Sequence, residues 1–161
     1  MLASDSEKTD IFGVRVALSG DTALISARRD DIEGVGIDAG SAYIFERSNG
    51  LWRQTEKLTA PDGNADDRFG RGVALTTNLA VISAMHSDAN ANNQGELYVY
   101  EKQNGKWRSK YRALANDASE DDKFGWNVAL YKNMAIVGTP YSDDNGTESG
   151  SAYILDIKKA P

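Results

Sequence analysis

The sequence contains the same pattern three times in succession, and this repetition limits the possible folds more than any other feature. Each copy begins with a Phe-Gly pair, at Phe12-Gly13, Phe69-Gly70 and Phe124-Gly125. An alternating apolar stretch follows each pair, and then come a second apolar run and a third run that starts at glycine. The period is about 55 residues, which places the repeats approximately at 5–61, 62–116 and 117–161 of one domain spanning 1–161.

Each short run is rich in valine, isoleucine and tyrosine and is bounded by turn residues, which is typical of a β-strand. The expected strands are 14–18, 23–26 and 40–45 in the first repeat, 71–75, 80–83 and 95–100 in the second, and 126–130, 135–138 and 150–155 in the third. A fourth strand is expected over 52–60 and over 107–115. It follows Asn49-Gly50 and Asn104-Gly105, and this dipeptide favours a type I′ hairpin turn because both residues accept positive φ.

The repeating unit is therefore predicted to be a four-stranded antiparallel meander, and the chain is expected to be all-β. One such sheet buries little apolar surface by itself. Sheets packed radially around an axis bury both faces, as in β-propellers of about 4–8 blades. A β-sandwich is the competing architecture, but it would not require the same four-stranded unit three times.

The repeats resemble the FG-GAP repeat family, the blades of integrin-type β-propellers, and especially its bacterial branch. The resemblance covers nearly the whole chain and is carried by three motifs: the D-x-F-G segments that begin at Asp10, Asp67 and Asp122, the V-A-L strands, and the G-S-A-Y starts at Gly40 and Gly150. It implies three consecutive blades, of which the third lacks its outer strand. We therefore expect a partial propeller or half of an oligomeric ring, completed by a second copy or by additional blades from a longer chain.

Integrin-type blades often hold calcium through a D-x-D-x-D-G loop between their first and second strands. Here that connection, at 18–22, is a tight turn with no room for such a loop. Carboxylates gather instead between the second and third strands, where the third repeat combines oxygen ligands with a glycine turn. The candidate Ca²⁺ ligands are Asp143, Asp144, Asn145 and Glu148, and the alternative is a solvated polar loop.

Candidate ligand-binding residues follow from the expected position of the first strands. If the innermost strands line the axial channel, Arg15, Arg71, Trp126 and Asn127 lie near its mouth. A few polar groups beside an aromatic ring suit a small ligand. The aspartate of each D-x-F-G segment is expected to accept backbone N–H bonds and to hold the turn into the first strand.

Two tryptophans, Trp52 and Trp107, begin the expected outer strands. Tryptophans at such positions are expected to cover the sheet of a neighbouring blade. A stacking platform for a sugar ring is the functional alternative.

Composition excludes several classes of function. The formal net charge of −6 argues against a nucleic acid or an anionic membrane as partner. No apolar run approaches the ~20 residues that span a bilayer, so no membrane insertion is expected. The chain has no cysteine, His86 is its only histidine, and G-x-S-x-G is absent, so we expect no catalytic residue and no enzyme activity.

The leading prediction is thus a non-enzymatic recognition module that presents its rim loops to a protein or glycan partner. One alternative is a structural propeller segment of a larger secreted protein with no ligand of its own. Another is a hydrolase with an unrecognised site. The resemblance implies a secreted, periplasmic or cell-surface location, although residues 1–8 show no signal peptide.

Overall fold

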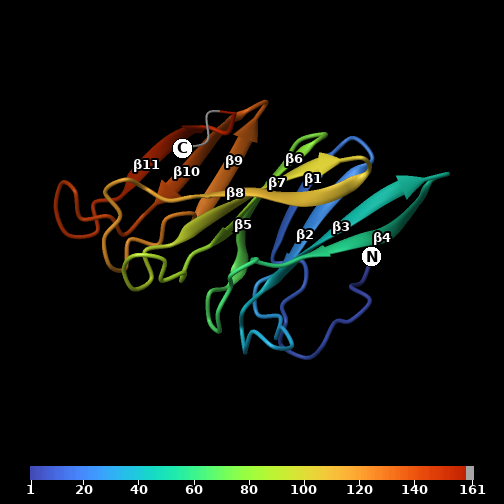
Figure 1. The fold of residues 1–161 in the computed structure, drawn as a ribbon, viewed down its shortest axis with the longest axis horizontal. Coiled ribbons are helices and arrows are strands. Elements are labelled where there is room, and N and C mark those ends of the chain that lie inside the picture. The colour runs from blue at the N-terminus through green and yellow to red at the C-terminus, as the bar shows by residue number, and fades with distance from the viewer. Residues whose placement is uncertain (159–161) are drawn as a thin grey trace.

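The computed structural model describes residues 1–158, and its regular secondary structure consists of three antiparallel sheets that lie side by side (Figure 1). The end of the third predicted repeat, residues 159–161, lies outside the described residues. We call the sheets blades 1, 2 and 3. Blade 1 contains β1 (Arg15–Ser19), β2 (Thr22–Ala27), β3 (Ser41–Ser48) and β4 (Leu51–Leu58); blade 2 contains β5 (Phe69–Leu75), β6 (Leu79–Ala84), β7 (Glu96–Gln103) and β8 (Lys106–Ala113); blade 3 contains β9 (Asn127–Tyr131), β10 (Met134–Thr139) and β11 (Ser151–Asp156).

The predicted all-β fold is confirmed, including a third blade of three strands. Each sheet is a meander in which successive strands pair antiparallel. The predicted hairpin residues Asn49, Gly50, Asn104 and Gly105 all have positive φ, at 52°, 78°, 50° and 78°. These values fit the type I′ turn, whose twist matches that of the flanking strands.

Neighbouring blades pack face to face through apolar side chains. The cluster between blades 1 and 2 includes Leu24, Ile44 and Leu58 of blade 1 with Val73, Ile82 and Trp107 of blade 2. A second cluster joins blade 2 to blade 3, and β5 contacts both β1 and β9, so the first strands of the blades are neighbours. Each blade therefore places the same face on the blade before it.

The outer-strand tryptophans behave as expected where a preceding blade is present. Trp107 is only 3% exposed and lies in the cluster with blade 1, and its backbone N–H is 3.2 Å from the carboxylate oxygens of Glu56 on β4. Trp52 is half-buried and packs on the free face of blade 1. The covering role of Trp107 follows directly from this packing.

A backbone ladder also joins the blades. The loop between the second and third strands of one blade runs beside the D-x-F-G segment of the next, so that Phe69 N–H donates to Ala39 O at 2.9 Å and Phe124 N–H donates to Gln94 O at 2.7 Å. At Gly95 a Cβ atom would lie 2.2 Å from the Phe124 carbonyl oxygen. This close approach explains why a glycine precedes the third strand.

The two end faces of the three-blade arc expose apolar side chains. Val16 and Leu18 on β1 are 67% and 68% exposed, and Ile136 and Ile154 on blade 3 are 49% and 67% exposed. The corresponding residues of blade 2 are covered by its neighbours and are buried. Within residues 1–158, the blade-to-blade contact is thus complete at two junctions and open at both ends.

Candidate functional site

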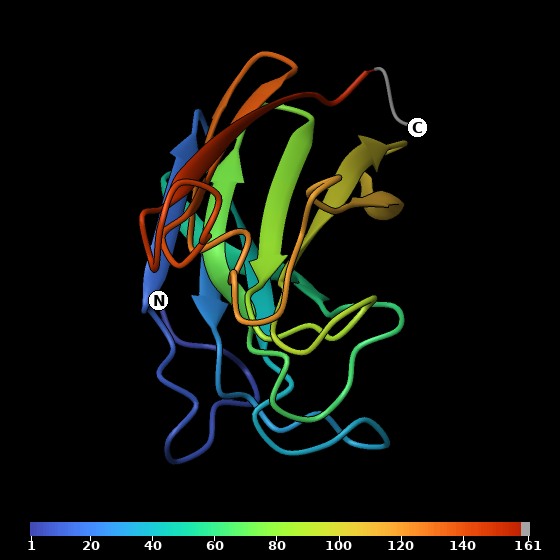
Figure 2. The same cartoon turned by 90° about the vertical axis from the view of Figure 1, so that its left-hand side faces the viewer.

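The D-x-F-G segments and the loops between second and third strands gather at one end of the sheets, where the blue, cyan and green loops lie at the bottom of Figure 2. In an antiparallel meander the start of the first strand and the end of the second strand lie at the same end of the sheet, as the Arg15–Ser26 pair of blade 1 shows. Residues that flank these two points are therefore brought together from successive blades.

These flanking residues form a hollow of about 400 Å³, which we call the basic pocket. It is lined by Val14, Arg15, Arg28, Arg68, Arg71, Met85, His86, Lys123, Trp126 and Tyr141. They come from three matching positions: the x of D-x-F-G, the residues after Phe-Gly, and the end of the second strand. The repeated fold thus brings these positions together, and the basic residues that occupy several of them make the pocket positively charged.

Arg71 lines the basic pocket and is 8% exposed. Its guanidinium carbon lies 4.0 Å from the centre of the Trp126 ring, and Nη1 donates to the Trp126 carbonyl oxygen at 2.9 Å. Trp126 meets the Tyr141 ring edge to face at 5.3 Å, and Lys123 Nζ lies 4.5 Å from the Tyr141 ring centre. Two aromatic rings therefore hold two cations by cation–π contacts.

The electrostatic character of the pocket is strongly positive, because its lining includes five basic side chains and no acidic one. Burial, followed by repulsion from Arg15 and Arg28, lowers the pKa of Arg71 to about 10. The pKa of His86 is also lowered, first by burial and then by the charges of Arg68 and Lys123. Burial alone would disfavour a charge of either sign, whereas the repulsion from neighbouring cations reports the positive charge of the surroundings.

Three of the four predicted ligand-binding residues, Arg15, Arg71 and Trp126, line the basic pocket. The fourth, Asn127, is exposed at the start of β9 and lies outside the lining. Whether any of them binds a ligand stays a prediction.

Sequence reasoning missed Arg28, Arg68, Lys123 and Tyr141. The sequence does indicate Arg68 and Lys123, because the residue at the x position of D-x-F-G is basic in the second and third repeats. At Arg28 the sequence alone suggests local neutralisation, because two acids, Asp30 and Asp31, follow closely.

In the structure Asp30 turns away from the arginines. It is buried, accepts a hydrogen bond from the Tyr43 hydroxyl at 2.7 Å, and forms an ion pair with Lys57 at 2.8 Å. Blade 2 has a similar network, but its acid is the first residue of β7 instead of lying in the loop after the second strand: Glu96 accepts from Tyr98 at 3.0 Å and pairs with Arg112 at 3.2 Å. Each carboxylate thus forms its ion pair with a basic residue of its own blade.

The aspartates of the D-x-F-G segments have the structural role that was expected. The carboxylates of Asp10, Asp67 and Asp122 are buried and accept the backbone N–H three residues earlier, at 2.5, 2.7 and 2.7 Å. They fix the turn that leads each Phe-Gly into the blade.

A family model described as the FG-GAP repeat matches residues 1–45, 52–100 and 107–155. This chain belongs to the FG-GAP repeat family. Among curated proteins, integrin alpha-2 from Mus musculus is 25% identical over 116 residues, which cover 68% of this chain and 9% of the integrin. The FG-GAP chain therefore spans about a tenth of the length of that relative.

Integrin-type FG-GAP repeats are in general non-enzymatic binding or structural modules of extracellular and cell-surface proteins. In residues 1–158 of this FG-GAP chain, no helix has the length and apolar character needed to cross a membrane.

The candidate calcium loop of the third FG-GAP repeat contains a turn found in all three. Asp143 Oδ1 accepts the Glu148 N–H at 2.7 Å, and Asp31 and Asp88 accept the corresponding N–H groups of their own loops at 2.8 and 2.7 Å. Asp144 accepts from two serine hydroxyls at 2.7 Å, and these bonds lower its pKa. Over the described part of the chain, no three acidic or histidine side chains are arranged to hold a metal ion. Calcium binding by Asp143, Asp144, Asn145 and Glu148 stays a prediction.

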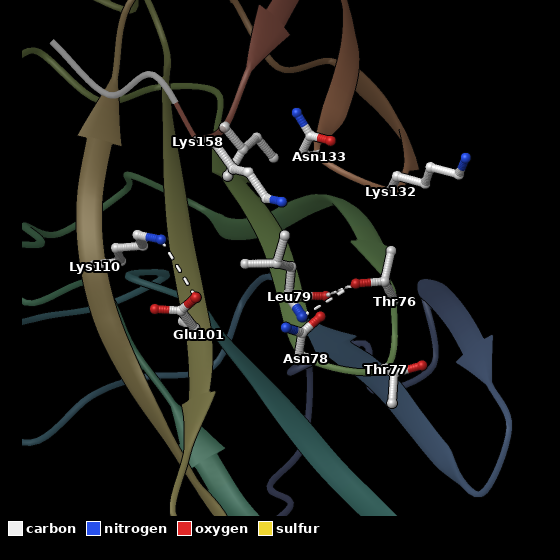
Figure 3. A pocket seen from close by; sticks show the side chains of 10 residues that line it. Thr76, Thr77, Asn78, Leu79, Glu101, Lys110, Lys132, Asn133 and Lys158 are labelled. Atoms are coloured by element: carbon white, nitrogen blue, oxygen red, sulfur yellow. Dashed lines mark hydrogen bonds and ion pairs between the residues drawn. The ribbon is translucent and has the colours of Figure 1, made fainter.

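A larger hollow of about 520 Å³ lies at the opposite end of the FG-GAP sheets, between blades 2 and 3 (Figure 3). Lys132 and Lys158 line this hollow, and Glu101 pairs with Lys110 at 3.3 Å. The backbone N–H of Leu79 is likewise bonded to the Thr76 hydroxyl at 3.1 Å. Because one acid lies among its three lysines, this hollow carries less net positive charge than the basic pocket and is a weaker candidate for an anionic ligand.

Proposed function

We propose that this FG-GAP segment is a non-enzymatic recognition module whose loop-bearing end binds a protein or glycan partner, with the basic pocket at the centre of the contact. The observation that carries the proposal is Arg71, a nearly buried guanidinium with no acidic partner among the described residues. The FG-GAP family supports a binding or structural role in general, and the positive charge of the basic pocket supports assigning that role to the loop-bearing end.

A buried cation without a counter-ion is costly, because removal from water disfavours the charged form. Ionisable groups whose pKa is shifted by burial and by neighbouring charges occur preferentially at functional sites. The acidic chain, with a net charge of −6, nevertheless collects five basic side chains in one hollow. That distribution favours recognition over a purely structural role for this end of the blades.

The proposal is tested by screening the protein against arrays of glycans and of extracellular proteins, with Arg15→Ala and Arg53→Ala variants in parallel. Both arginines lie on strands, but Arg53 is exposed on β4 and does not line the basic pocket. We expect saturable binding that Arg15→Ala weakens and Arg53→Ala leaves unchanged. Absence of saturable binding to either array, or equal loss in both variants, would overturn the proposal.

A structural role beside recognition is favoured by the open apolar faces of blades 1 and 3. We propose that further blades of the same type cover them, from a longer chain or from a second copy that forms a closed ring. The free D-x-F-G segment of blade 1 already has the positive φ at Thr9 and Ile11, 83° and 56°, that the docked segments show at Asp66 and Arg68.

Light scattering coupled to size exclusion separates the two sources of blades. A two-chain ring gives about twice the 17.5 kDa of the chain, and Ile154→Asp should return it to the single-chain mass. A single-chain mass for the unmodified protein assigns the missing contacts to other parts of a longer protein. We further propose a secreted, periplasmic or cell-surface location, because integrin-type FG-GAP proteins are in general extracellular or at the cell surface.

A further inference from the structure

We infer that the basic pocket binds one carboxylate group, supplied by an acidic side chain of a protein partner. The inference rests on the proposed recognition function and adds the chemistry of the ligand. Its basis is the set of unused donors around Arg71 and the arrangement of charges at the edge of the pocket.

The donors converge from different blades. Arg15 comes from β1, Arg28 follows β2, and Arg71 is part of β5. In the described part of the chain Arg28 has no hydrogen bond or ion pair, while Arg15 and Arg71 donate only to the backbone carbonyls of Val14 and Trp126. Guanidinium groups present planar pairs of N–H donors that match the two oxygens of a carboxylate.

Arg68 adds positive charge at the same site. The Nε atom of Arg68 is buried without a hydrogen-bond partner, although its Nη2 pairs with Asp66 at 3.1 Å. Because this Nε atom has almost no accessible surface, Arg68 contributes its positive charge to the pocket and not a free donor. Arg68 therefore adds to the attraction for a negative group entering the basic pocket.

The aromatic rings of the pocket favour an anion over a neutral sugar. Arg71 covers the Trp126 ring and Lys123 stands over the Tyr141 ring. Both rings therefore hold cations in place instead of offering a bare platform on which a sugar could stack.

The edge of the pocket favours a single negative charge over a polyanion. Asp66 and Asp121 lie beside the basic residues, with side chains that are 70% and 61% exposed. They would repel the several charges of an acidic polysaccharide or a nucleic acid more than a single carboxylate flanked by neutral residues. The volume of about 400 Å³ accommodates one acidic side chain and its backbone.

The test is a titration monitored by the indole N–H signal of Trp126 in NMR spectra, at constant ionic strength. The probe is the capped peptide Gly-Asp-Gly, its matched control is capped Gly-Asn-Gly, and trigalacturonate serves as the carbohydrate carboxylate. We expect a saturable shift with the aspartate peptide only. Saturation with both peptides, with neither, or with trigalacturonate alone would overturn the assignment.

Variants locate the binding. Arg28→Gln should weaken the peptide by about tenfold or more, because a hydrogen bond between charged groups contributes about 1.5–3 kcal/mol. Arg53→Gln should leave the affinity unchanged, and both variants should keep the backbone spectrum of the folded protein. Equal affinities for Arg28→Gln and the unmodified protein would refute the site even if the peptide binds elsewhere.

Failure of this inference is distinguishable from failure of the recognition function. If the arrays reveal a partner but the aspartate peptide does not bind and Arg28→Gln has no effect on the partner, recognition stands and the carboxylate assignment is wrong. If the peptide binds at Trp126 while no partner is captured, the anion site stands and the wider recognition function is wrong.

Discussion

Alanine at Gly125 should destabilise the protein much more than alanine at Gly13, although both residues occupy the same place in the Phe-Gly pair. Both have a φ of 90°, which L-residues rarely adopt, so the backbone cost of substitution is common to the two. Non-glycine residues in such regions cost about 1–3 kcal/mol each. The difference between the variants therefore isolates what the added methyl group meets.

At Gly125 the new Cβ atom would lie 2.5 Å from the Cβ of Ser83 in the preceding blade, whereas at Gly13 no atom lies within 4 Å. Ser83 cannot withdraw freely, because its hydroxyl donates to Gly125 O at 2.6 Å and accepts from Gly72 N–H at 2.7 Å. Forcing an additional carbon into a packed contact costs about 1–3 kcal/mol. We therefore expect Gly13→Ala to lose about 1–3 kcal/mol and Gly125→Ala about 2–6 kcal/mol.

The assay is urea unfolding followed by tryptophan fluorescence at several protein concentrations. Gly70→Ala serves as a second test of the same contact, since its Cβ would lie 2.7 Å from that of Ser26. The reasoning fails if Gly125→Ala and Gly13→Ala differ by less than about 0.5 kcal/mol at low concentration, because independent surface changes already vary by that amount.

Three further predictions follow from the buried groups and the acidic loop. Burial raises the pKa of the Glu96 carboxyl above 4.5, against the opposing effects of Tyr98 and Arg112. The folded state therefore binds this proton more tightly than the unfolded state does. As a result, the free energy of unfolding should fall as the pH rises from 4.5 through the raised pKa. Glu96→Gln should remove that part of the pH dependence in denaturant titrations, and a pH-independent difference between the two proteins would contradict it. Trp107→Ala should cost about 3–5 kcal/mol in the same assay and Trp52→Ala clearly less, because only Trp107 covers a preceding blade; equal losses would show that the covering role is wrong. Millimolar Ca²⁺ should raise the melting temperature of the unmodified protein and not that of Asp143→Asn. In this variant an amide oxygen can still accept the Glu148 N–H, so the turn itself is kept. An unchanged melting temperature in both proteins would show that the loop does not bind calcium.

The fold could be predicted from the sequence because its signals are local and occur three times. Asn-Gly at 49–50 and 104–105 determines a hairpin by backbone preference alone, and alternation in the strands identifies the buried faces. The ladder between blades could not be read in this way. It depends on carbonyl groups such as Ala39 O and Gln94 O, which any residue type provides.

The candidate site was only partly predictable for a different reason. Arg15, Arg71 and Trp126 follow the Phe-Gly pairs and could be placed by their position in the repeat. The contribution of Arg28 could not be predicted without the direction of the Asp30 side chain, because neighbouring side chains near the end of a strand point into different environments. The sequence showed opposite charges side by side, whereas the fold separates them into the basic pocket and a buried ion pair.

Hydrogen exchange of the Phe69 and Phe124 amides tests the central claim most directly, namely that successive blades are joined through the D-x-F-G segments. Both amides donate to carbonyls of the preceding blade, at 2.9 and 2.7 Å, and both phenylalanines are fully buried. The account predicts that the two amides exchange at rates close to those of the central strands β2 and β6. Exchange of Phe69 and Phe124 as fast as that of the exposed loop amides near Asn145 would show that the blades are not joined in this way.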